Sequence, residues 1–155
     1  MTENKTIVLS DDKPVDMGDE ETRQLLDDFG EYLLQFDQVD LPLKHTFTDG
    51  VYIREIFIPA GTLVAGKLHR HNHFNFISSG TVTVRTKDGV ETLTGPIGMV
   101  STAGTKRALL AHTDVVWTTI HANPTNETDL DKLEAMIVAP SYEALAKSNQ
   151  LENIL

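Results

Sequence analysis

The chain has 155 residues, no cysteine and a formal net charge of −10. This length fits one domain with a buried core, and the lack of cysteine excludes disulfides and thiolate chemistry. The acidic balance argues against nucleic-acid binding, which needs clustered basic side chains. No apolar stretch is long enough for a membrane span and no secretory signal is recognisable, so we expect a cytoplasmic protein.

The negative charge is concentrated near the N-terminus. Residues 1–40 contain 12 acidic and 3 basic side chains, whereas residues 41–155 contain 11 and 10. Residues 1–18 are polar and poor in core-forming side chains, so we expect a flexible acidic segment there. Such a segment is usually a solvated surface, and a partner-binding arm is the alternative.

Residues 19–40 are expected to form an amphipathic helix. Acidic residues occupy its first turn, where the helix dipole favours them, and large apolar residues recur at helical spacing. The apolar positions are Leu25, Leu26, Phe29, Tyr32, Leu33 and Phe36. This face must be buried, either on the rest of the chain or on a partner, and the sequence leaves both open.

Residues 41–124 have the pattern of an antiparallel β-protein. Turn sequences recur about every ten residues, and segments rich in β-branched and aromatic residues lie between them. The predicted strands are residues 51–58, 62–69, 73–77, 81–87, 90–94, 99–102, 106–110 and 115–121. Short, evenly spaced strands of this kind predict an all-β sandwich or barrel. Residues 125–155 are expected to add a helical tail, with its last helix at residues 142–146.

Three of the six histidines, His69, His71 and His73, fall within five residues. Lys67 precedes them with the same two-residue spacing. In an extended strand the side chains of Lys67 and the three histidines would therefore all point to the same side. Two neighbouring imidazoles can then share one metal ion but four side chains cannot, so a complete site needs a further strand. The candidates for that contribution are His121, His112, Asp114 and Glu55. A histidine-rich strand edge without a metal is the alternative.

The segment from Gly61 to Gly80 resembles the first motif of the cupin superfamily. That motif is a Gly, five residues, His-x-His, three or four residues, a Glu, six residues and a Gly. Aligned on its two glycines, the segment has Lys67 at the first His position, His69 at the second and His73 at the Glu position. With the predicted helices, the resemblance implies a cupin-type (jelly-roll) β-barrel with an N-terminal amphipathic helix and short C-terminal helices.

The segment from Gly95 to Arg107 resembles the second cupin motif, with Thr102-Ala103-Gly104 in place of its Pro-x-Gly and one extra residue. Arg107 stands where the motif has its ligand histidine. Lys67 and Arg107 together would place fixed positive charge in the barrel, which disfavours a cation and favours an anion such as a carboxylate or a phosphate ester.

If a metal binds, we expect His69 and His73 to hold it, with either His71 or His121. The ion would be a divalent Zn, Fe, Mn or Ni. A different alignment takes His69 and His71 as the family's histidine pair, but it needs a two-residue deletion before Gly80 and puts Asn75 in the Glu position.

We therefore expect a small cupin that binds a divalent metal, a small anionic ligand, or both. Lys67, Arg107 and Trp117 are the candidate ligand-binding residues, with a core role as the alternative for Trp117. An enzyme of this type would be a metal-dependent isomerase, lyase or dioxygenase, with Lys67 or His71 as acid or base. The alternative is a non-catalytic binding or structural module with a degenerate metal site.

Residues 51–142 also resemble small cupins encoded in phages and prophages, a group that implies no particular reaction. A small barrel with open strand edges and an additional apolar helix is expected to cover these surfaces in a homodimer.

Overall fold

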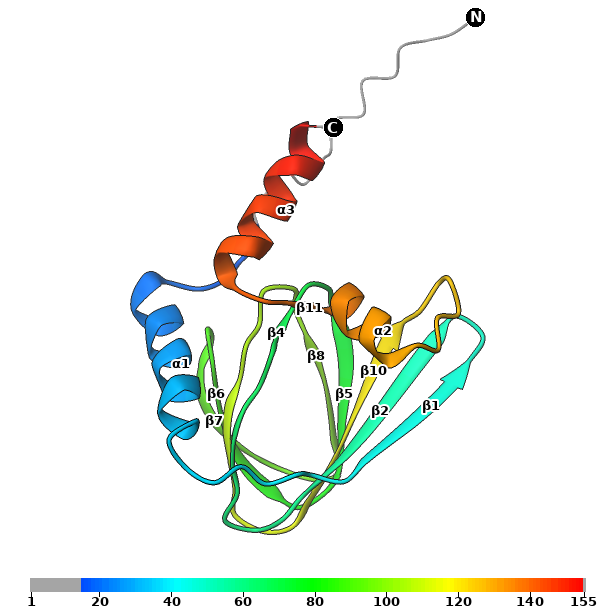
Figure 1. Ribbon diagram of the computed structural model, residues 1–155. Helices are drawn as coiled ribbons and strands as arrows, with labels where there is room; N and C mark the ends of the chain where they lie inside the picture. Colours follow the sequence, from blue (N-terminus) through cyan, green and yellow to red (C-terminus); the bar gives the residue numbers. More distant parts are fainter. Residues whose placement is uncertain (1–14, 155) are drawn as a thin grey trace, which may run out of the picture.

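Residues 15–154, which the computed structural model describes, form a β-barrel with three α-helices around it (Figure 1). The expected flexible acidic segment lies outside the described residues, except for its last four residues. These four lie against the barrel, where Asp16 forms an ion pair with Lys87 at 3.0 Å. No helix of the described part is long and apolar enough to cross a membrane.

The barrel consists of two antiparallel sheets. In spatial order, the larger sheet contains β1 (Leu43–Thr48), β2 (Val51–Ile58), β10 (Val115–Ala122), β5 (His73–Ser79) and β8 (Ile97–Ser101). The second sheet contains β3 (Leu63–Ala65), β9 (Ala108–Ala111), β6 (Thr81–Thr86) and β7 (Gly89–Thr94). Two further short strands, β4 (Leu68–His69) and β11 (Val138–Ala139), pair with each other. The predicted all-β barrel is confirmed.

Inward-facing apolar side chains of both sheets form one core. It includes Ile58, Ile77, Val82, Leu109 and Trp117, which come from five different strands and are all buried. Alternation along each strand puts these residues on the inner side and leaves polar residues outside. The core fills only part of the barrel, and the remaining interior space holds the site described below.

Two strand predictions were wrong. The single strand expected at 62–69 is divided into β3 and β4, because the backbone amide of Gly66 donates to the carbonyl of Arg107 at 2.7 Å and β4 then pairs with β11. A Cβ at Gly66 would lie 3.0 Å from that carbonyl oxygen, so the close approach favours glycine. Strand β1 was not predicted, because its sequence is mostly polar and its side chains are largely exposed.

Helix α1 (Glu20–Leu33) begins at the N-cap Asp19, whose side chain accepts a hydrogen bond from the Thr22 amide at 2.7 Å. It ends seven residues before the predicted boundary at residue 40. The helix packs against β3 and β9 of its own chain and buries Leu26 there. Leu25 and Tyr32 remain exposed, so this barrel covers only part of the apolar face.

The C-terminal tail contains α2 (Leu130–Ile137), β11 and α3 (Tyr142–Ile154). Helix α2 and β11 lie across one end of the barrel, while α3 projects away from it (Figure 1). Leu133 and Ile137 of α2 pack on Tyr52 of β2, which anchors the helix to the larger sheet. The last helix extends to residue 154, beyond the predicted end at residue 146.

Candidate functional site

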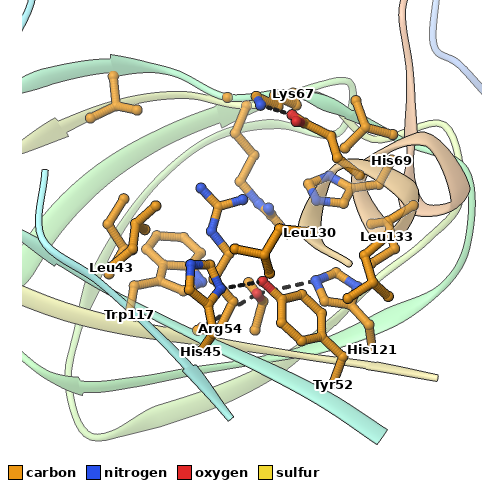
Figure 2. A pocket seen from close by; sticks show the side chains of 18 of the residues that line it. Leu43, His45, Tyr52, Arg54, Lys67, His69, Trp117, His121, Leu130 and Leu133 are labelled. Carbon is orange, nitrogen blue, oxygen red and sulfur yellow. Dashed lines mark hydrogen bonds and ion pairs between the residues drawn. The ribbon is translucent and has the colours of Figure 1, made fainter. Parts of the chain in front are cut away.

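A cavity of about 370 Å³ lies inside the barrel. One wall is formed by inward-facing residues of β1, β2 and β10, and the other by residues around β3, β4 and β9. Helix α2 adds five side chains at the end that it covers. Figure 2 shows Trp117, Arg54 and Tyr52 on the first wall and Lys67 and His69 opposite them. This volume is typical of a small-molecule site.

Three histidine rings meet at this end of the barrel. His69 ends β4, His73 begins β5 and His121 lies near the end of β10. The ring centroids of His69 and His73 are 4.3 Å apart, those of His73 and His121 are 4.7 Å apart, and those of His69 and His121 are 5.7 Å apart. Residues distant in the sequence thus form one imidazole cluster.

Burial keeps this histidine cluster uncharged at neutral pH. Desolvation, followed by repulsion from neighbouring histidines and arginines, lowers the pKa of His69 to about 2 and that of His121 to about 3. Desolvation and the Arg107 charge lower the pKa of His73 to about 4. Nδ1 of His69 and Nε2 of His73 are buried without a hydrogen-bond partner in the described part of the chain.

Arg107 is the buried cation of the site, with 8% of its surface exposed. It precedes β9 and donates a hydrogen bond from Nη2 to Oγ of Ser101. Its guanidinium lies over the indole of Trp117, with Cζ 5.3 Å from the ring centroid, which is a cation–π distance. Desolvation lowers the pKa of Arg107 to about 10, so the group stays cationic at neutral pH.

A buried hydrogen-bonded network holds Arg107 and Trp117 in place. The indole Nε1 of Trp117 donates to Oδ1 of Asn75 at 3.0 Å, and Nδ2 of Asn75 donates to Oγ of Ser101 at 2.8 Å. Ser101 therefore accepts from both Asn75 and Arg107. Asn75 is fully buried at 0% exposure, so its amide has no access to solvent and is committed to this network.

Three residues of the first wall were not foreseen from the sequence. Tyr52 and Arg54 of β2 and His45 of β1 line the cavity, and His45 Nδ1 is 2.6 Å from the Tyr52 hydroxyl. Burial raises the pKa of Tyr52. The predicted strand 51–58 already put Tyr52 and Arg54 on one face, but the direction of that face could not be derived without β1 as its neighbour.

No family model matches the sequence, and no curated protein matches it. Solved structures do match. The barrel superimposes on an ectoine synthase from P. lautus with a TM-score of 0.51 and 14% identity, over 64% of this chain and 75% of that chain. It also matches salicylate 1,2-dioxygenase from Pseudoaminobacter salicylatoxidans with a TM-score of 0.51 and 15% identity, over 76% of this chain and 32% of that chain. A cupin superfamily protein from Desulfitobacterium hafniense DCB-2 matches with a TM-score of 0.45 and 13% identity, over 56% and 83% of the two chains.

The chain has the cupin fold. Within this cupin barrel, the positions aligned with the motif ligands do converge: His69, His73 and Arg107 surround one region, and Lys67 lies at its rim. His121, outside both motifs, joins them from β10. The structure thus places Arg107 and Trp117, two of the expected ligand-binding residues, on the cavity surface.

His71 is not brought into the cupin cavity. The condition that residues 67–73 form one extended segment is not met at Arg70, whose backbone amide donates to the Ile137 carbonyl at 2.8 Å and whose Nε donates to the Val138 carbonyl at 3.1 Å. The chain bends there and His71 is exposed. His71 is therefore not positioned as an acid, a base or a ligand in the cavity.

Lys67 lies at the rim of the cavity with its side chain about half exposed, and its Nζ forms an ion pair with Glu134 of α2. Desolvation, with a smaller effect of Arg54, lowers the pKa of Lys67. Glu134 therefore already balances the charge of Lys67.

The other candidate ligands lie elsewhere on the cupin barrel. His112 is hydrogen-bonded to Thr83 on the surface of the second sheet, Asp114 accepts from the Ala60 amide in a turn, and Glu55 is exposed on the outer face of β2. Of the four proposed second-strand contributions, His121 is the one that the structure brings to the cluster.

The three clustered histidines are not arranged as a ready-made site for a divalent ion. Neutral imidazole is the form that binds metals, and two ring nitrogens of the cluster have no hydrogen-bond partner in the described part of the chain. The rings of His69 and His121 are nearly parallel, at 10°, with their centroids 5.7 Å apart. Among residues 15–154, no three His, Asp or Glu side chains form a group that could hold a metal ion.

Proposed function

We propose that this barrel binds a small organic anion, with Arg107 as its principal partner. One observation carries the proposal: Arg107 is buried on the cavity surface, and no carboxylate of the described residues lies within ion-pair distance of it. A buried charge without a counter-charge is unfavourable, so a bound anion stabilises the site.

The rest of the cavity favours the same ligand. Arg54 adds a second guanidinium on the opposite wall, and it too has no ion-pair partner in the described part of the chain. The histidine cluster is neutral at pH 7, so His69, His73 and His121 neither repel nor neutralise an anion. Arginine forks bind carboxylates and phosphates through paired hydrogen bonds.

The test is calorimetric titration of the full chain with small carboxylates and inorganic phosphate, repeated on Arg107→Gln. The glutamine retains a donor for Ser101 but lacks the charge. We expect binding of at least one anion by the unmodified protein, and binding weakened by about 10–100-fold in the variant. Equal affinity in both proteins contradicts the proposal. Arg85→Gln, at an exposed position of β6, is the matched control and is expected to bind normally.

A divalent metal held by His69, His73 and His121 is the second candidate, favoured by the two unpartnered ring nitrogens. It requires the rings to turn so that their nitrogens converge. Metal analysis of protein purified without a histidine tag separates the two: stoichiometric zinc, iron, manganese or nickel that is lost in His69→Ala and His73→Ala supports the metal site. Metal far below one equivalent, with no thermal shift on adding these ions, excludes it.

A further inference from the structure

The inner face of the larger sheet is arranged in layers along the strand direction. Register places Phe47, Tyr52 and His121 side by side in the layer nearest α2. His45, Arg54 and Thr119 form the next layer. Leu43, Ile56 and Trp117 form the third layer, and Ile58 pairs with Val115 beyond it. The wall therefore changes from aromatic and imidazole, through cationic, to apolar.

The facing sheet repeats this order. Val64 and Leu109 pair across β3 and β9, and both line the cavity. Gly66 and Arg107 each lie two residues from this pair, on the side of the histidine cluster. The backbone amide of Gly66 donates a hydrogen bond to the Arg107 carbonyl. On both walls an arginine, Arg54 or Arg107, thus lies nearer the histidine cluster than the apolar side chains do, and these two residues are called the arginine layer. From Arg54 to Ile58 the wall extends four residues, or about 13 Å along the strand.

The charge of the cavity surface is nearly balanced. Its charged side chains are Arg54, Lys67, Arg107, Asp131 and Glu134, while its histidines include the neutral His69 and His121. Three cations and two carboxylates leave one net positive charge. A singly charged carboxylate matches this balance better than a doubly charged phosphate ester does.

We infer that the ligand is an amphipathic carboxylate, whose carboxylate lies in the arginine layer and whose apolar body fills the layers around Ile56, Val64 and Leu109. This inference rests on the proposed anion binding and specifies its ligand class. Aliphatic side chains offer no partner for a second polar group, so a polar body at that end would lose its hydrogen bonds to water. An apolar body gains affinity for each methylene that it buries there.

The test is calorimetric titration of the full chain with four probes: octanoate, acetate, inorganic phosphate and octanamide. We expect octanoate to bind at least about 100-fold more tightly than acetate, because six additional methylenes become buried. Octanoate is also expected to bind more tightly than phosphate, which has no apolar body, and at least about tenfold more tightly than octanamide, which lacks the charge.

Two neighbouring variants locate the apolar body. Val64→Phe fills the apolar end of the cavity and is expected to reduce octanoate affinity to that of acetate. Leu63→Phe, the adjacent residue on the exposed side of β3, is the matched control and is expected to leave octanoate affinity unchanged. If Val64→Phe does not fold, Val64→Ala enlarges the same region and is expected to shift the preferred chain length upward.

The possible results distinguish failure of the amphipathic ligand class from failure of anion binding at Arg107. If acetate or phosphate binds as tightly as octanoate and Arg107→Gln weakens the binding of each, the amphipathic ligand is wrong and anion binding stands. If octanamide equals octanoate, the anion proposal itself is wrong. If no probe binds, both are overturned, and an unchanged octanoate affinity in a folded Val64→Phe protein overturns the placement of the apolar body.

Discussion

The guanidinium of Arg107 lies on the indole ring of Trp117, and both side chains are joined through Asn75 and Ser101. The cation is therefore fixed before any ligand arrives. Preorganisation of this kind reduces the entropic cost of binding, because the side chain does not have to be ordered by the ligand. It also means that the site stores an unfavourable buried charge in the absence of an anion.

A trade-off between stability and binding is expected at Arg107. Replacing Arg107 by Gln removes a charge-assisted contact of about 1.5–3 kcal/mol and should weaken anion binding by about 10–100-fold. The same change relieves the uncompensated buried charge, so the free energy of unfolding should stay constant or rise. Denaturant unfolding without ligand, combined with calorimetry, measures both quantities. A variant that loses binding only because it is unfolded would contradict this expectation.

Asn75 is expected to be essential for the geometry of the site. Asn75→Ala leaves the Trp117 Nε1–H unpartnered, removes one bond to Ser101 and creates a small cavity, so it should destabilise the fold by about 2–4 kcal/mol. A double-mutant cycle with Trp117→Phe, in which urea unfolding is measured for the two single variants and the double variant, gives the coupling energy between Asn75 and the indole of Trp117. A coupling energy near zero would show that the Asn75–Trp117 bond contributes nothing.

Stability is expected to fall as the pH is lowered below 6.5. The three buried histidines have pKa values lowered from 6.5 to about 2, 4 and 3, so between pH 6.5 and about pH 4 the unfolded chain binds protons that the folded chain does not. In this range each histidine lowers the free energy of unfolding by at most about 1.4 kcal/mol for every pH unit of acidification.

Variants assign this pH dependence to the cluster. His73→Gln is expected to make the decline between pH 6 and pH 4 less steep in urea unfolding. His71→Gln, which changes the exposed histidine two residues away, is the control and should leave the slope as it is. Equal slopes for His73→Gln and the unmodified chain would contradict the assignment.

We predict that the chain forms a homodimer through the outer face of its larger sheet. Phe74 and Phe76 of β5 are exposed there, and Val100 of β8, which is 67% exposed, lies beside Phe74. The outward positions of β5, β8 and β10 carry no charged side chain, so this face lacks the repulsion expected between copies of a chain with a net charge of −10.

Light scattering tests this prediction. Phe74→Glu should convert a dimer into a monomer, whereas Leu25→Glu on the exposed side of α1 should not. The reverse result would place the interface on the helix, and a monomeric unmodified chain at micromolar concentration would contradict the dimer altogether.

Much of the architecture could be predicted from local sequence. Strands such as 81–86 alternate apolar and polar residues, and turns such as Ser79-Gly80 have a local backbone requirement: Gly80 has φ +98°, which favours glycine. Such signals depend on a few neighbouring residues, so they can be recognised without the tertiary structure.

The cavity surface could be predicted only in part. By spacing alone, His71 was as good a candidate for a cavity residue as His69 and His73. The hydrogen bonds of Arg70 to residues 137 and 138, however, turn His71 outward. Those contacts join parts of the chain that are nearly 70 residues apart. Local periodicity contains no information about them.

Local sequence patterns were sufficient to predict the barrel, its turns and a histidine-rich segment followed by Arg107. Which side chains share the interior depends on contacts between distant parts of the chain: His121 joins His69 and His73, Arg54 faces inward beside His45, and Glu134 pairs with Lys67. The reason is physical. Strand periodicity is set by neighbouring residues, whereas a cavity is defined by the register between strands that are distant in the chain.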